Sequence, residues 1–155
     1  SYFPDKRLLF MEVARCECGR QADEAVHLMD LTAPPRTVLT EAATRMVDFF
    51  LSDFGLRVFR ICVAESDRFP ELGHEFYDSG PALVKKRLVG YFSDAVARGE
   101  LAIDNLDLAA AQFMELCKAN LFQRLVFGVG GPATAEDRRQ VIDGAVDLFL
   151  ARYGA

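Results

Sequence analysis

The sequence lacks long apolar runs and basic runs, and each absence excludes a class of protein. No apolar stretch approaches the ~20 residues that a membrane-spanning helix needs, so we expect no membrane association. The opening residues show no charged-then-apolar signal pattern, which favours a cytoplasmic protein. The net charge is -5 and no basic run exceeds 85–87. These residues therefore lack the positive surface of a nucleic-acid binder.

Tryptophan is absent and histidine occurs only twice, as His27 and His74. Neither histidine lies near a recognisable serine, cysteine or carboxylate arrangement, so we do not expect an enzyme. The Glu-x-x-His spacing of di-iron helical bundles does not recur along the chain. On a helix, Cys16 and Cys18 would point about 200 degrees apart and could not easily share a metal. We therefore expect no cofactor, no metal, and free thiols in a reducing compartment.

Apolar residues, in contrast, are abundant. The 155 residues fit one domain, yet 51% of them are hydrophobic and 13 are phenylalanine. This is more apolar surface than a minimal core requires. A dimer interface or an apolar pocket would account for the excess.

The periodicity predicts an all-α fold, a helical bundle of about six or seven helices without strands. We expect helices to start at Pro4–Asp5, near Pro35 and Leu56, and at Pro70 and Pro81. The first should bury Leu9, Val13 and Cys16, and continue this face with Arg20 and His27. Asn105 or Asp107 should cap the next helix. Thr134 and Asp137 resemble a capping box that opens the last.

The stretch from Leu108 to Gly128 reads as one helix with two functional faces. Asn120 and Arg124 fall within its apolar stripe, where an unpaired polar group is costly, so they are candidates for ligand contacts. Phe122 and Val126 project on the opposite, polar face, where a second subunit could cover them. Two plainer explanations stay open. A single exposed phenylalanine is ordinary, and an arginine near a helix end can cap carbonyl groups.

The last helix carries an apolar arc too wide for one neighbouring helix to cover. Gly144 beside this arc would let another helix approach closely. The last two long helices therefore look like half of a four-helix dimer interface. The residues predicted for the homodimer interface are Phe122, Val126, Val141, Gly144, Ala145, Leu148 and Arg152.

Three segments carry a resemblance: SYFPDKRLLFMEVA at the start, RICVAESDRFPELGHEFYDSGP (60–81), and AVDLFLARYG (145–154). In this order they resemble the end of the helix-turn-helix, the middle of the effector domain and the end of the effector domain in the TetR family of transcriptional regulators. The resemblance implies that residues 1–10 are the remnant of a DNA-binding domain and the start of a connecting helix. Residues 11–155 would then form an effector-binding and dimerisation domain. Tyr2 and Lys6 would belong to the tail of the DNA-reading helix.

The resemblance implies a homodimeric, ligand-responsive repressor that binds DNA through an N-terminal domain absent from these residues. The stub SYFPDK favours a chain that once continued before Ser1 over one that regulates without DNA. A small apolar or aromatic effector would act by preferring the state that cannot bind DNA. The candidate ligand-binding residues are Met46, Phe50, Phe59, Cys62, Phe92, Phe113, Cys117, Asn120, Arg124 and His27. The alternative is an all-α dimeric adaptor without a small-molecule ligand.

Overall fold

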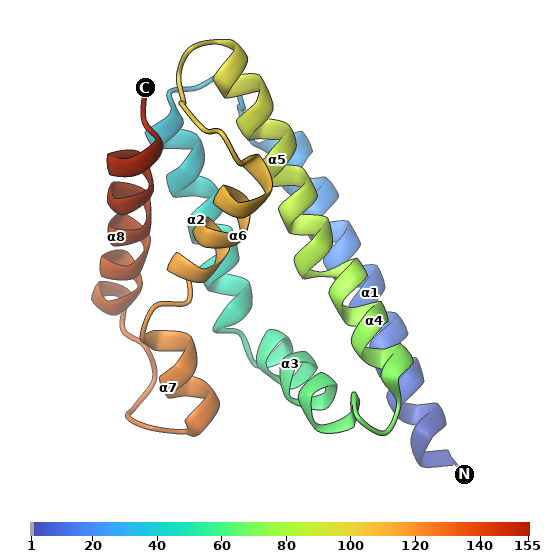
Figure 1. Ribbon diagram of the computed structural model, residues 1–155. Helices are drawn as coiled ribbons and strands as arrows, with labels where there is room; N and C mark the ends of the chain where they lie inside the picture. Colours follow the sequence, from blue (N-terminus) through green and yellow to red (C-terminus); the bar gives the residue numbers. More distant parts are fainter. Residues whose placement is uncertain (1) are drawn as a thin grey trace.

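The computed structural model describes residues 2–155, although the side chains of residues 2–5, 7 and 26 lie outside that description. The chain folds into helices connected by short turns (Figure 1). Their bounds are α1 (Tyr2–Leu28), α2 (Pro35–Phe50), α3 (Asp53–Glu65), α4 (Pro70–Ser79), α5 (Pro81–Ala97), α6 (Leu106–Leu116), α7 (Leu121–Phe127) and α8 (Ala135–Tyr153). Within residues 2–155 the extended structure is limited to one bridge between Leu101 and Gly154. The all-α prediction is confirmed.

Among the described residues, none of the helices combines the length and the apolar character needed to cross a bilayer.

Local signals set most of the helix boundaries. Prolines occupy the first turns of α2, α4 and α5, where the missing N–H has no partner to lose. The Asn105 side chain accepts a hydrogen bond from the Leu108 N–H at 3.0 Å. Thr134 and Asp137 form the predicted capping box. The third helix begins at Asp53 rather than Leu56, because the Ser52 hydroxyl caps it by accepting from the Gly55 N–H at 2.9 Å.

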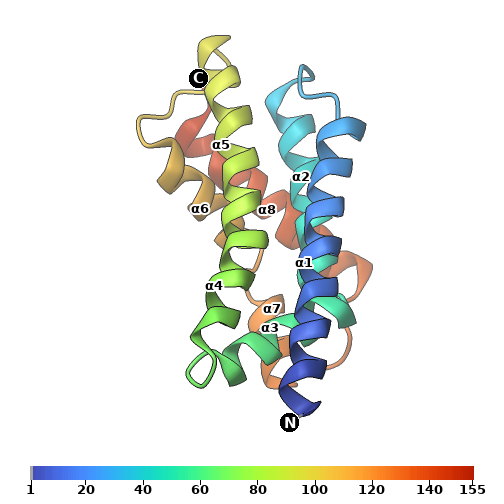
Figure 2. The same cartoon turned by 90° about the vertical axis from the view of Figure 1, so that its right-hand side faces the viewer.

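The main hydrophobic core lies between α2, α5, α6 and α8. At its centre the Phe149 ring lies 5.1 Å from the rings of both Phe92 and Phe113, and these three side chains are almost fully buried. A smaller cluster joins α1, α3 and α4 through Met11, Ala14, Val58, Cys62 and Leu72. Figure 2 shows α1 running beside α4 and α5, on the side of the molecule away from α8.

The predicted inner face of α1 is wrong. The side chains of Leu9 and Val13 are 66% and 52% exposed, and Cys16, Arg20 and His27 are also exposed. Met11 and Ala14 are buried instead, against α3 and α4. The helix also starts at Tyr2, ahead of the expected Pro4. Two apolar faces run along α1. Leu9 and Met11 are two positions apart, so at 100° per residue they are rotated by 200° and lie about 160° apart around the helix. The neighbouring helices decide which series is covered.

The single helix predicted for Leu108–Gly128 is also wrong. The chain leaves the helical path after α6, and a short separate helix, α7, follows. At this break Asn120 has a φ of +64° and a ψ of −55°, and the Leu121 N–H donates to the Ala119 carbonyl at 2.7 Å. This is a γ-turn, a strained backbone geometry that is rare in proteins. The shared stripe of Phe113, Asn120 and Arg124 therefore does not exist. The penultimate element of the proposed dimer bundle is two short helices rather than one long one.

Candidate functional site: an aromatic cleft between α3 and α7

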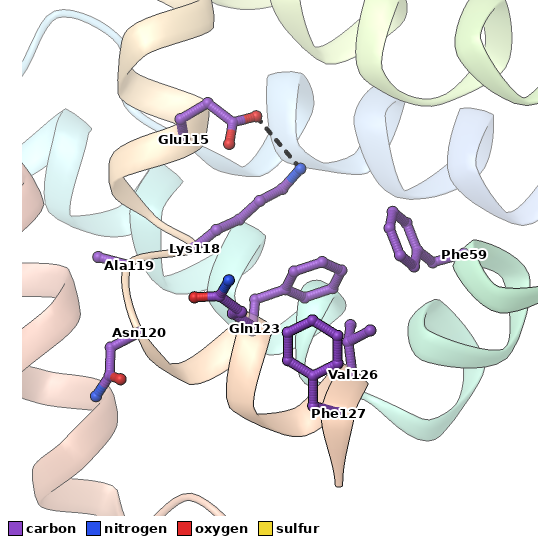
Figure 3. A pocket seen from close by; sticks show the side chains of 9 residues that line it. Phe59, Glu115, Lys118, Ala119, Asn120, Gln123, Val126 and Phe127 are labelled. Carbon is purple, nitrogen blue, oxygen red and sulfur yellow. Dashed lines mark ion pairs between the residues drawn. The ribbon is translucent and has the colours of Figure 1, made fainter. Parts of the chain in front are cut away.

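An open cleft of about 490 Å³ lies between α3 and the α6–α7 segment (Figure 3). This volume falls within the range of about 300–1,000 Å³ that is typical of small-molecule sites. The lining residues are Phe59, Glu115, Lys118, Ala119, Asn120, Phe122, Gln123, Val126 and Phe127.

Aromatic rings from different helices form one wall of the cleft. The Phe122 ring of α7 lies 5.0 Å from the Phe59 ring of α3, at an interplanar angle of 83°. The Phe50 ring of α2 lies 6.1 Å from Phe122 on another side, at 65°. Both pairs have the edge-to-face geometry that aromatic rings favour. An aromatic ligand could add to this arrangement by the same kind of contact.

The same aromatic series continues from the cleft to α1. Phe50 contacts Phe49, whose ring lies 6.3 Å from that of Phe54. Phe54 in turn lies 5.9 Å from Phe10 of α1. Phe122, which lines the cleft, is therefore the first member of a row of packed rings that ends on the N-terminal helix.

Lys118 supplies the positive charge of the cleft. Its Nζ atom lies 5.0 Å from the Phe50 ring centre and 5.4 Å from the Phe122 ring centre. The same atom is 3.5 Å from the Glu115 carboxylate, an ion pair drawn as a dashed line in Figure 3. The Lys118 side chain is only 26% exposed, whereas that of Glu115 is 74% exposed.

Arg60 ties α3 to the end of α7. Its guanidinium group donates hydrogen bonds to the carbonyl oxygens of Leu125 and Val126, at 3.2 and 2.9 Å. These carbonyls belong to the last turn of α7, where few helical N–H groups remain to pair with them. The Leu125 carbonyl also accepts a hydrogen bond from the Gly128 N–H at 3.1 Å. The contact therefore holds the two sides of the cleft at a defined separation.

Only some of the predicted ligand-binding residues lie at this cleft. Phe59 and Asn120 line it, and Phe50 packs behind Phe122. The Asn120 side chain points away from Phe59 (Figure 3). Its backbone is thus its main contribution to the cleft.

The other predicted ligand-binding residues are elsewhere. Four of them are buried in the main core: Met46, Phe92, Phe113 and Cys117. Cys62 belongs to the smaller cluster, with its sulfur 3.8 Å from that of Met11. His27 is exposed on α1. Arg124 lines a second cleft of about 560 Å³, between the α2–α3 corner, α7 and the loop at 128–133.

Burial makes the core thiols poor nucleophiles. It raises the pKa of Cys117 to about 12 and that of Cys62 to about 11, because desolvation disfavours the thiolate. The thiolate is the reactive form of cysteine. The structure thus gives Cys117 the character of a small apolar core residue.

The residues predicted for a dimer interface are divided between the surface and the interior. On α8, Gly144, Leu148 and Arg152 are exposed, and the Leu148 side chain is 60% exposed. Val141 and Val126 are half-buried. Ala145 is 3% exposed, so its own chain already covers it.

Phe122 was expected to lie exposed for a second subunit to cover, but its own chain covers part of it. Its ring does not project into solvent but packs on Phe50 and Phe59 of its own chain. Of the residues predicted to face DNA, Lys6 is exposed, whereas the side chain of Tyr2 lies outside the described residues.

Sequence reasoning missed Lys118 and Glu115 as cleft residues, because it treated the whole stretch as one helix. One signal could have revealed the break. Lysine and asparagine are common near the ends of helices, and Lys118 and Asn120 both follow Leu116, the last residue of α6. A helix ending at Leu116 would have separated α7 from the stripe on α6.

The sequence matches one known protein family. Residues 37–155 match the family model described as the AefR-like transcriptional repressor, C-terminal domain. Among curated proteins, none has significant sequence similarity to this chain.

Several solved structures have the same fold. The flavonoid-responsive regulator FrrA is 30% identical, with a TM-score of 0.81 over 99% of this chain and 77% of its own. A protein assigned to the TetR family of transcriptional regulators, from Mesorhizobium loti MAFF303099, is 23% identical, with a TM-score of 0.84 over 99% and 78%. A TetR-family regulator from Pseudomonas syringae pv. tomato DC3000 is 20% identical, with a TM-score of 0.71 over 99% and 76%.

The family match covers most of the chain, and the helical fold and the resemblance of the three sequence segments agree with it. The chain therefore belongs to the TetR family of transcriptional regulators and contains that family's C-terminal domain.

Proposed function

We propose that this chain is the effector-binding and dimerisation domain of a ligand-responsive transcriptional repressor, and that its effector is a small aromatic molecule. The observation that carries this proposal is the cleft at Phe59 and Phe122, whose aromatic wall is built from α3 and α7, with Phe50 of α2 packed behind Phe122. A regulator that is 30% identical to this chain is described as flavonoid-responsive. A flavonoid is itself a planar aromatic molecule, of the kind that such a wall favours.

The signal would pass from the cleft to α1 through the packed aromatic series. A ligand that displaces Phe122 also moves the rings that connect it to Phe54 and Phe10. Arg60 adds a second link, because it fixes α3 to α7. A shift of α1 would change the placement of an N-terminal DNA-binding domain. The effector controls this equilibrium only by its difference in affinity for the two states.

For the assembly, we propose a homodimer that uses the outer face of α8. Leu148 is a large apolar side chain that is 60% exposed there, and the space around Gly144 is open. Such a face permits close helix approach in a symmetric interface. DNA contacts would come from a helix-turn-helix domain that precedes this region in the complete regulator. The compartment we propose is the cytoplasm, where such a regulator meets DNA.

A thermal-shift titration tests the effector site, with flavone as the probe. A ligand at 100 times its dissociation constant adds ~2.7 kcal/mol to the free energy of unfolding. We expect flavone to stabilise the wild-type chain but not Phe59→Ala. The matched control is Phe69→Ala, which removes a half-buried ring at the α3–α4 corner, outside the cleft lining. This variant should keep the response.

Two results would contradict the proposal. If flavone and related aromatic probes leave a dimeric wild-type chain unstabilised, an adaptor without a small-molecule ligand becomes the better explanation. If both variants respond like the wild type, aromatic ligands bind somewhere other than this cleft.

A further inference from the structure

The cleft combines apolar walls with a single partly buried cation. Of its lining side chains, Lys118 alone carries a positive charge, and Glu115 alone carries a negative one. Apart from the Glu115 carboxylate, the groups described near the ammonium are the faces of Phe50 and Phe122. A ring face attracts a cation through its quadrupole, but it does not neutralise the charge.

The ion pair with Glu115 leaves most of this charge available. The two residues are three positions apart, and the Glu115 carboxylate stands in solvent on a side chain that is 74% exposed. Exposed pairs of this kind contribute little, because water and salt screen them and long side chains lose entropy on pairing. A ligand anion that enters the cleft could therefore replace Glu115 at the ammonium group with little loss.

The geometry also places the cation beside the aromatic wall. Because Nζ lies within 5.4 Å of the Phe122 ring centre, and that ring lies 5.0 Å from Phe59, one small molecule can reach both. Its ring would pack at Phe59 and Phe122 while a substituent pairs with the ammonium. The amide of Gln123, which also lines the cleft, adds a neutral donor.

We propose that the cleft selects aromatic acids, and that Lys118 recognises their anionic oxygen. This inference rests on the proposed effector function and specifies the class of effector. A charge-assisted hydrogen bond in a partly desolvated site is roughly twice as strong as a neutral one. The anionic group should therefore add affinity beyond that of the aromatic ring.

The test uses two probes of the same shape, 2-naphthoate and the neutral 2-naphthamide, with dissociation constants measured by isothermal titration at physiological salt. For the wild-type chain we expect naphthoate to bind about tenfold more tightly than naphthamide. Lys118→Met keeps the apolar stem and removes the charge, so it should abolish this preference while naphthamide binding stays unchanged. Lys118→Arg should restore the preference.

Two further variants make the test specific. Lys86→Met removes an exposed lysine on α5 that does not line the cleft, and it should leave the preference intact. Glu115→Gln removes the exposed carboxylate that pairs weakly with Lys118, and it should leave the preference for naphthoate intact. A merely structural role for Lys118 would weaken the binding of both probes equally.

The possible failures are distinguishable. If both probes bind the wild type equally, or if the preference survives in Lys118→Met, the inference is wrong while the effector site remains. If neither probe binds while flavone stabilises the chain, the inference is wrong and the effector site remains; if flavone also leaves the chain unstabilised, the proposed effector function is overturned along with it. If probe binding separates a dimer into monomers, as seen by light scattering, the cleft is an interface between two copies and the inference also fails.

Discussion

The Phe122→Ala substitution separates two roles for this residue, packing within its own chain and contact between chains. Phe122 is half-buried and contacts Phe50 and Phe59 in a single chain. Truncation of a fully buried phenylalanine costs about 3–5 kcal/mol. Since only part of this ring is buried, we expect a loss of about 2 kcal/mol in the free energy of unfolding. For a chain of this length that corresponds to a decrease in Tm of ~4–8 °C.

Phe127→Ala is the matched control, because Phe127 lies on the same helix and is 71% exposed. Its truncation should change the free energy of unfolding by no more than ~0.5 kcal/mol. Both variants are compared with the wild type by guanidinium and thermal denaturation at two protein concentrations. A Phe127→Ala loss as large as that of Phe122→Ala, growing with concentration, would refute the reasoning. That result would mean that a second subunit buries this end of the cleft.

Three further predictions concern a helix cap, the thiols and the break before α7. Thr134→Ala should lower stability by about 1 kcal/mol in chemical denaturation, because it removes the side-chain acceptor of the α8 capping box; an unchanged midpoint would contradict this. At pH 8, a disulfide reagent should label exposed Cys16 promptly but Cys117 only after unfolding, since burial raises the pKa of Cys117 to about 12. Asn120→Val should destabilise the chain by ~1–3 kcal/mol, whereas Asn120→Gly should be neutral or slightly stabilising, because glycine adopts a φ of +64° with a ψ of −55° without a steric cost. Equal midpoints for the two variants would argue against this backbone conformation.

The starts of most helices could be predicted because their causes are local. Pro35, Pro70 and Pro81 each open a helix, and the cap at Asn105 needs only a residue three positions ahead. Such contacts are fixed by short stretches of chain, whatever packs around them. The three resembling segments likewise identified the family from sequence alone.

The site was less predictable, because it depends on the direction of each helix in space. Helical-wheel reasoning assumes an unbroken rotation of 100° per residue, and the positive φ at Asn120 ends that continuity. Beyond the break, Phe122 turned out to face Phe59 of α3, more than sixty positions earlier in the sequence. No local pattern encodes such a pair.

By itself, then, the sequence determined the all-α class, most of the helix starts and the family. Only the tertiary structure decided which face of α1 is buried, at Met11 and Ala14 rather than Leu9 and Val13. It alone also decided that Lys118 lies beside two aromatic rings. The physical reason is the same in both cases: caps and turns are satisfied by neighbours along the chain, whereas burial and charge placement depend on which distant helices come together.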